Sequence, residues 1–94
     1  MKYTLHYSSR FKKSYKRVKQ FPSFKKELFN EVLDTLMVGG ILPERFHDHS
    51  LAGDMSGYRE CHIAPDILII YEIQNKILEL VMINIGTHSQ LFRS

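Results

Sequence analysis

The sequence has 94 residues, of which 44% are hydrophobic and 24% are charged, and its formal net charge is +3. We expect residues 1–94 to form a single domain, because a chain of this length supports only one modest core. No apolar run approaches the ~20 residues that a membrane-spanning helix requires, and the polar, basic start lacks the apolar stretch of a secretory signal. These features predict a cytoplasmic protein with no membrane partner, and the single cysteine excludes an internal disulfide.

Positive charge is concentrated at the start of the chain. Residues 1–26 contain nine Lys or Arg and no acidic residue, whereas residues 27–94 contain four basic and ten acidic residues. Such a field attracts a polyanion, because each neutralised phosphate releases condensed counterions. RNA, DNA or an acidic protein segment would all fit, and a solvated lysine-rich helix surface would need no partner.

A strand and a basic helix are predicted at the N-terminus. The segment "KYTLHY" alternates Tyr3, Leu5 and Tyr7 with other residues, which indicates a strand with one buried face. Ser8 and Ser9 can supply N-cap oxygens for a helix whose apolar residues recur at helical spacing among lysines and arginines.

A second helix is expected after the break at Pro22, which cannot continue a helical hydrogen-bond ladder. Ser23 can cap this helix, and a broad apolar stripe runs from Phe24 to the glycine pair that begins at Gly39. Residues 41–57 then lose all periodicity, and their proline, glycines and polar residues indicate an extended surface loop.

Three strands are predicted in the second half, at residues 58–63, 67–73 and 77–85, joined by the turn-forming segments "APD" and "QNK". The middle run, "ILIIYEI", is typical of a central strand covered on both faces. The expected fold is therefore α+β: an N-terminal strand, a two-helix hairpin and then a three-stranded antiparallel meander. The helices should lie on one face of a largely antiparallel sheet.

Titratable side chains gather in the loop, the strand ends and the tail. His62 and Asp66 stand four residues apart across the predicted hairpin turn, and the end of the next strand at Gly86 would bring His88 to the same edge of the sheet. Two groups that titrate near neutrality suit chemistry that removes one proton and donates another. The ordinary alternatives are exposed loop histidines, a strand histidine satisfied by a neighbour, and a turn aspartate that accepts backbone hydrogen bonds.

A metal site is the rival use of the same side chains. His47 and His49 can face one side of an extended segment. The side chains that could complete a zinc shell with them are Cys61, His62, Asp66 and His88. However, the sequence has no compact metal-ligand motif, and the adjacent Cys61 and His62 would point to opposite faces of a strand. We therefore expect neither a metal nor a cofactor.

Two segments, "HDHSLAGDMSGYRECHIAPDILIIYEI" and "IGTHSQLF", resemble the YafQ branch of the RelE/ParE toxin superfamily, the toxin halves of bacterial toxin–antitoxin pairs. The similarity is densest between residues 46 and 92, and the N-terminal half matches in helix order and basic character. The resemblance implies a small microbial-RNase-like α+β fold and ribosome-dependent cleavage of mRNA without a metal. It also implies a cognate antitoxin that wraps the toxin, and a toxin–antitoxin complex that binds operator DNA through the antitoxin.

The resemblance further implies roles for particular residues. Asp66, with or without His62, would take the 2'-hydroxyl proton of RNA as the hydroxyl attacks the adjacent phosphate, and His88 would protonate the leaving 5'-oxygen. His49 and His62 would hydrogen-bond the phosphate, and Phe92 would stack on a base. The basic residues expected to dock on ribosomal RNA phosphates are Lys12, Lys13, Lys16 and Arg17.

Two positions depart from the family pattern. Asn84 stands where some relatives carry an arginine, so transition-state charge would rest on histidinium groups or on Arg59, which we include among the substrate-binding candidates. Ile67 stands where an aromatic residue can follow the "PD" pair. These departures keep open a catalytically weak or inactive module that binds an antitoxin or RNA without cleavage. A gyrase-poisoning relative is the third alternative.

Overall fold

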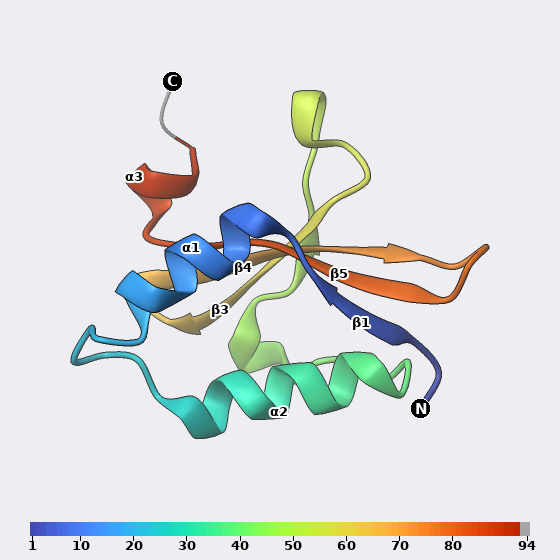
Figure 1. Ribbon diagram of the computed structural model, residues 1–94, viewed down its shortest axis with the longest axis horizontal. Helices are drawn as coiled ribbons and strands as arrows, with labels where there is room; N and C mark the ends of the chain where they lie inside the picture. Colours follow the sequence, from blue (N-terminus) through green and yellow to red (C-terminus); the bar gives the residue numbers. More distant parts are fainter. Residues whose placement is uncertain (93–94) are drawn as a thin grey trace.

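A five-stranded mixed sheet runs through the molecule (Figure 1). The computed structural model describes residues 1–92, and its strands lie side by side in the order β1, β5, β4, β3, β2. The strands are β1 (Thr4–Tyr7), β2 (His49–Ser50), β3 (Arg59–Ala64), β4 (Ile67–Gln74) and β5 (Glu79–Gly86). β1 pairs with β5 in parallel, and all other neighbouring strands are antiparallel. The predicted α+β fold, with its N-terminal strand and three-stranded meander, is therefore confirmed.

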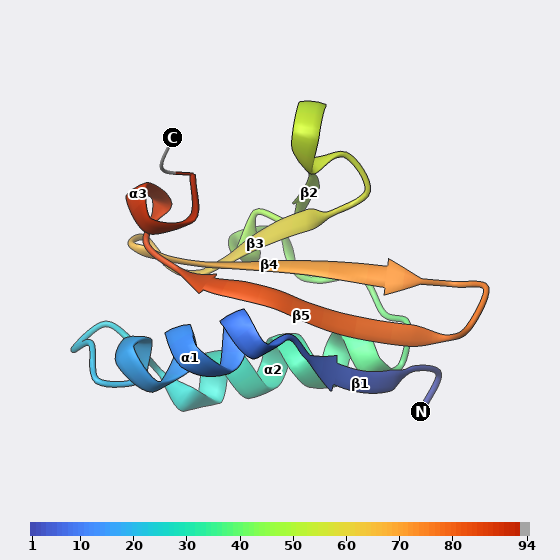
Figure 2. The same ribbon diagram turned by 45° about the horizontal axis from the view of Figure 1, so that its top comes forward.

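Two helices cover one face of this sheet, and a short third helix lies on the other side (Figure 2). The helices are α1 (Ser9–Val18), α2 (Lys26–Met37) and α3 (His88–Leu91), and single 3-10 turns are formed by Glu44–Phe46 and Gly53–Met55. The expected helix pair is confirmed, whereas α3 and the short strand β2 were not predicted. None of the helices in residues 1–92 has the length and apolar content that a crossing of a lipid bilayer requires.

Ser8 joins the first strand to α1 and ties both to β5. Its Oγ accepts a hydrogen bond from the Phe11 N–H at 3.0 Å, which caps the helix as predicted, and donates to the Ile83 carbonyl at 2.6 Å. The alternation predicted for β1 holds only in part. Tyr3 is buried, but Tyr7 is 38% exposed and stacks on Phe11 with the ring centroids 5.3 Å apart.

The start of α2 differs from the prediction. The helix begins at Lys26, and its N-cap residue Lys25 forms no side-chain cap. The hydroxyl of Ser23 instead donates a hydrogen bond to Asp66 Oδ2 at 3.1 Å, so the prediction that Ser23 caps this helix was wrong. A hydroxyl two residues before the N-cap lies too far along the chain to serve the N–H groups of the first turn. The predicted helix end is confirmed, because Gly39 adopts the left-handed φ of 76° that follows many helices.

Buried side chains lie on both faces of the sheet. Cys61, Ile69 and Tyr71 belong to the core beneath the helices and are at most 1% exposed. Leu68 and Ile70 point to the opposite face, because alternate residues of a strand do so, and yet each is only 2% exposed. This second face is therefore also covered, and Figure 2 shows α3 and β2 on that side.

Candidate active site

Asp48 fixes the loop that carries two of the candidate histidines. Its carboxylate accepts a hydrogen bond from the Tyr71 hydroxyl and forms an ion pair with Arg59 Nη2 at 2.8 Å. Arg59 Nη1 also donates to Ser50 Oγ at 2.7 Å. Burial and the hydrogen bond to Asp48 raise the pKa of Tyr71, so this hydroxyl keeps its proton and donates it. The hydrogen bond to Asp48 likewise raises the pKa of Arg59. The loop is thereby held against β3 and β4.

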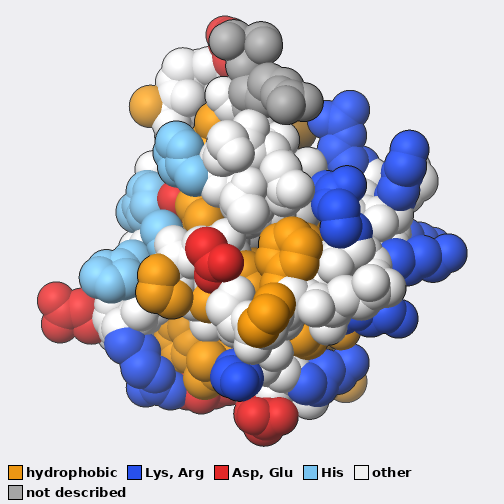
Figure 3. All heavy atoms as spheres, turned by 90° about the vertical axis from the view of Figure 1, so that its left-hand side faces the viewer, with side chains coloured by type: hydrophobic (Ala, Val, Ile, Leu, Met, Phe, Trp, Pro, Cys, Tyr) orange, Lys and Arg blue, Asp and Glu red, His pale blue; other side chains and the backbone are white. Residues whose placement is uncertain are grey.

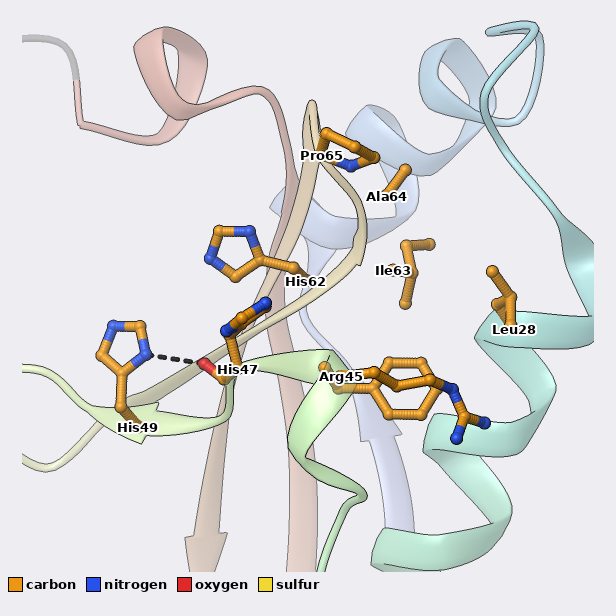
Figure 4. Close-up of a pocket in the computed structure, with 9 residues that line it drawn as sticks. Leu28, Arg45, His47, His49, His62, Ile63, Ala64 and Pro65 are labelled. Carbon is orange, nitrogen blue, oxygen red and sulfur yellow. Dashed lines mark hydrogen bonds between the residues drawn. The ribbon is translucent and has the colours of Figure 1, made fainter.

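His47 and His49 flank Asp48, and His49, in β2, points to the side opposite Asp48 because neighbouring residues of an extended segment do so. His49 pairs with Glu60 in the β2–β3 ladder, and its Nδ1 lies 2.8 Å from the His47 carbonyl oxygen. The His47 backbone has a left-handed φ of 50°. The centroid of the His47 ring lies 5.7 Å from that of the His62 ring, at an interplanar angle of 73°. Three imidazoles thus converge, as the close-up in Figure 4 shows.

A buried carboxylate, that of Glu60, joins two of these imidazoles. Its Oε1 lies 3.3 Å from His49 Nε2 and 3.4 Å from His62 Nε2. Glu60 is 5% exposed, so little water competes for these contacts. The residue was not among the predicted site residues, although one signal was present in the sequence. Glu60 and His62 are two positions apart in a strand and therefore share one face.

The imidazoles border a surface cleft of about 750 Å³. Its lining residues are Leu28, Arg45, Phe46, His47, His49, His62, Ile63, Ala64 and Pro65. Figure 4 shows the three histidines on one side of the close-up, with Leu28 and Arg45 on the other. Arg45 forms an ion pair with Glu31 and lies over the Phe46 ring, 4.6 Å from its centroid. The cleft therefore combines a wall of histidines with an apolar floor.

The end of β5 brings His88 to the same end of the sheet as His62. His62 pairs with Leu68 of β4, and Leu68 pairs with Gly86 of β5, so the three residues form one row across the strands. α3 starts at His88, two residues beyond this row. The structure therefore places His62 and His88 at the same end of the sheet, as was predicted from the sequence.

Local hydrogen bonds in the "GTH" segment set the position of His88. The N–H of Gln90 donates to Thr87 Oγ1, and the Gln90 side chain accepts from the Thr87 N–H at 2.9 Å, which is a capping box. A Cβ at Gly86 would lie 2.8 Å from Gln90 Oε1, so glycine allows this close approach. The His88 ring centroid lies 4.9 Å from that of Phe92, which brings these two predicted site residues together.

Asp66 lies at the same edge of the sheet, in the exposed turn between β3 and β4. Its carboxylate accepts the hydrogen bond from Ser23. Within residues 1–92, no ion pair joins Asp66 to a histidine, and the ion pair of His62 is made with Glu60. The structure thus brings His49 and His62 together on Glu60 and places Asp66 apart from that contact.

Arg59 lies on the other face of β3 from the histidines. It is adjacent to Glu60 in the strand, so the two side chains point to opposite sides, and its guanidinium is engaged by Asp48. The structure therefore does not bring Arg59 together with His49 and His62. Asn84 is in the same row of the sheet as Glu60, with β4 between them.

The basic residues of α1 form a separate surface. Lys12, Lys13, Lys16 and Arg17 are exposed on this helix, which packs on the sheet face opposite Glu60 and His62. In Figure 3, Lys and Arg side chains predominate on one flank of the view and histidines on the other. Any RNA that bound to both surfaces would have to extend around the edge of the sheet.

Cys61 does not join the histidines. Its side chain is 0% exposed, and burial raises its pKa, which disfavours the thiolate that binds metals or attacks as a nucleophile. Across residues 1–92, no three His, Cys, Asp or Glu side chains are grouped as metal ligands. Of the side chains that could complete a zinc shell with His47 and His49, Cys61 points to the face of β3 opposite His62.

The fold is that of the small α+β toxins of the RelE-like class. A match to the family described as "Bacterial toxin of type II toxin-antitoxin system, YafQ" extends over residues 3–93. The chain therefore belongs to the YafQ family, and the resemblance read from the sequence is confirmed.

Individual relatives agree with this assignment. The mRNA interferase toxin YafQ of Escherichia coli K12 is 34% identical over 94 residues, covering 98% of this chain and 94% of that protein. A YafQ relative from Haemophilus influenzae is 45% identical over 51 residues, and this match spans 52% of this chain and half (50%) of that protein. A copper-bound mutant toxin from Helicobacter pylori has a TM-score of 0.88 at 33% identity, over 96% of this chain and 99% of that one. YafQ in the E. coli DinJ–YafQ complex has a TM-score of 0.82 at 28% identity, over 96% and 98% of the two chains.

Proposed function

We propose that this chain is the toxin of a type II toxin–antitoxin pair and an mRNA endoribonuclease that acts on the ribosome, in the cytoplasm. The observation that carries this proposal is the convergence of His49 and His62 on the buried Glu60, in a chain of the YafQ family. The E. coli K12 relative is named an mRNA interferase. Imidazoles fixed by a carboxylate at the wall of a cleft are suited to acid–base chemistry.

RNA cleavage at this site would begin with attack of a ribose 2'-hydroxyl on the adjacent phosphate. His62 or Asp66 would take the hydroxyl proton, and His88 would donate a proton to the departing 5'-oxygen. His49, which is half exposed at the cleft, would hydrogen-bond the phosphate and stabilise its developing charge. Phe92, whose ring lies beside His88, would stack on a base.

A cognate antitoxin is the protein partner in this proposal. The E. coli YafQ relative was solved in a toxin–antitoxin complex with DinJ. By analogy, an antitoxin would neutralise this toxin, and the pair would bind operator DNA through the antitoxin. Ribosomal RNA and mRNA would be the nucleic-acid partners of the unbound toxin, with the basic face of α1 contacting phosphates.

A binding module without cleavage is the second candidate, and one observation favours it. Asn84 stands where some relatives carry an arginine, and the guanidinium of Arg59 is engaged by Asp48 on the other face of β3. Charge stabilisation would then depend on the histidines alone. Such a module would retain binding to the antitoxin or to RNA and lose only the chemical step.

Ribosomes programmed with a defined mRNA provide the direct test. Purified protein should create new 5' ends at the decoding site, detected by primer extension, and should leave the same mRNA intact when ribosomes are omitted. Intact mRNA on programmed ribosomes would overturn the proposal. Growth arrest on induction in the absence of any cleavage would favour the binding module.

Removing the positive charge of α1 should weaken binding to the ribosome. The test variant replaces Lys12, Lys13, Lys16 and Arg17 with glutamine. Its slope of log affinity against log salt concentration should become shallower by about 1 for each phosphate that the helix no longer neutralises. Folding should be unchanged, because these side chains are exposed. Binding titrations at several salt concentrations measure the slope.

The matched control for this variant is Lys76→Gln, in the exposed turn between β4 and β5. It should bind ribosomes as the unaltered protein does. An unchanged slope in the α1 variant would exclude this helix as the ribosome-binding surface.

A further inference from the structure

We propose that Glu60 is a positioning residue of this site, which orients the His62 imidazole so that its Nδ1 takes the proton from the RNA 2'-hydroxyl. The inference rests on the proposed nuclease function and selects His62 over Asp66 as the base within it. Glu60 itself acts through His62 and His49, which its carboxylate contacts.

The burial of Glu60 requires an explanation. It lies opposite Ile70 in the β3–β4 ladder and is only 5% exposed, and a buried charge is strongly unfavourable unless it is paired. Apolar residues that replace buried ion pairs often leave a protein equally or more stable. The partners of this carboxylate are the imidazoles of His49 and His62, which border the cleft. Its effect on these two rings explains why an acid is placed here.

A carboxylate can only accept hydrogen bonds, so it selects the protonation of the imidazole nitrogen that it contacts. The contact with His62 is made through Nε2, at 3.4 Å. This ion-pair contact favours the tautomer of neutral His62 that has its proton on Nε2 and its lone pair on Nδ1. His62 lines the cleft, and the proposal requires that Nδ1 face a hydroxyl bound there.

His49 has an acceptor partner at each of its two ring nitrogens, and this difference from His62 assigns the two rings different roles. Its Nδ1 lies 2.8 Å from the His47 carbonyl oxygen and its Nε2 lies 3.3 Å from Glu60 Oε1, and both partners are acceptors. Both ring nitrogens of His49 therefore face acceptor atoms, which suits this ring to donate to a phosphate and leaves the role of base to His62.

The protons and bonds of the cleavage step balance with these assignments. The 2'-oxygen forms a bond to phosphorus as its proton passes to His62 Nδ1. The bond from phosphorus to the 5'-oxygen breaks, and the 5'-oxygen takes a proton from His88, which leaves a 2',3'-cyclic phosphate and a 5'-hydroxyl. Glu60 stabilises the imidazolium of His62 without taking its proton, as the carboxylate of a serine protease triad does for its histidine.

Cleavage kinetics test the role of Glu60. Glu60→Gln should reduce kcat on programmed ribosomes by roughly 10²-fold, because an amide neither stabilises an imidazolium nor fixes its tautomer. Glu60→Asp should recover much of the activity, since it keeps the charge. The matched control is Glu79→Gln, because Glu79 pairs with His6 between β5 and β1, 3.0 Å apart and away from the cleft. Wild-type cleavage by Glu60→Gln would overturn the inference.

Histidine side-chain ¹⁵N NMR gives a readout that needs no RNA. In the unaltered protein, neutral His62 should carry its proton on Nε2, and Glu60→Gln should lose this preference. His6 should change only in Glu79→Gln. Protonation of neutral His62 on Nδ1 in the unaltered protein would overturn the inference even if Glu60→Gln failed to fold. An Nε2-protonated His62 in a protein that does not cleave mRNA would refute the nuclease function and leave the positioning contact standing.

Discussion

Replacing His88 with alanine should reduce mRNA cleavage on programmed ribosomes by roughly 10² to 10⁴-fold, the usual contribution of a general acid or base. His88 is exposed at the first position of α3, and the capping box that fixes this helix uses Thr87 and Gln90 rather than the imidazole. Folding should therefore be nearly unaffected, since exposed substitutions usually change stability by less than about 0.5 kcal/mol. Single-turnover cleavage rates and thermal unfolding curves measure the two effects.

Two further variants sharpen this result. Ser89→Ala, at the next position of α3, which is also exposed, should cleave as the unaltered protein does. His88→Gln should fail as alanine does, because an amide can donate a hydrogen bond but cannot deliver its proton to the leaving oxygen. Full cleavage by His88→Ala would remove this residue from the mechanism.

The parts of the fold that could be predicted are encoded by nearby residues. Ser8 caps α1, Gly39 ends α2, and the apolar run of β4 forms a central strand. By contrast, β2 has only 2 residues and exists through its pairing with β3, so no local pattern marks it. α3 did have a local signal, the capping box of Thr87 and Gln90, but a helix of four residues is too short to show a hydrophobic period.

For the candidate site, the sequence indicated which residues lie near one another better than it indicated which side chains are in contact. His49 and His62 meet at Glu60 because the register of β2 on β3 sets His49 opposite Glu60, and no local pattern fixes the register of so short a strand. The hairpin turn suggested a link between His62 and Asp66. Asp66 instead bonds Ser23, which lies 43 positions away in the chain. Such a contact depends on how the helices pack on the sheet.

A single carboxylate connects the fold to the site. Asp48 binds Arg59 and Tyr71, and the residues before and after it, His47 and His49, line the cleft. Side chains alternate along an extended segment, so an aspartate anchored on β3 and β4 directs the neighbouring His49 of β2 away from that anchor. Within the "HDH" motif, Asp48 therefore acts as a clamp that holds the segment with the two candidate histidines at the cleft.

Asp48→Ala should lower the free energy of unfolding by about 1 to 3 kcal/mol, mainly because the buried Tyr71 hydroxyl loses its partner. The Arg59 side chain is 37% exposed, so removal of its ion pair adds little. For a domain of this size, the change corresponds to a fall in Tm on the order of 10 °C. Cleavage should fall as well, because β2 loses its anchor and His49 loses its alignment on Glu60.

Tyr71→Phe separates the two consequences of removing the clamp. It deletes the buried hydroxyl but keeps the ion pair between Asp48 and Arg59 at 2.8 Å, so the loop should stay in place and cleavage should be close to that of the unaltered protein. In Asp48→Ala, the Tm and the cleavage rate should therefore both fall. In Tyr71→Phe, only the Tm should change. If Asp48→Ala lost stability but cleaved mRNA at the full rate, the clamp would serve the fold alone, and the alignment of His49 would come from Glu60 without it.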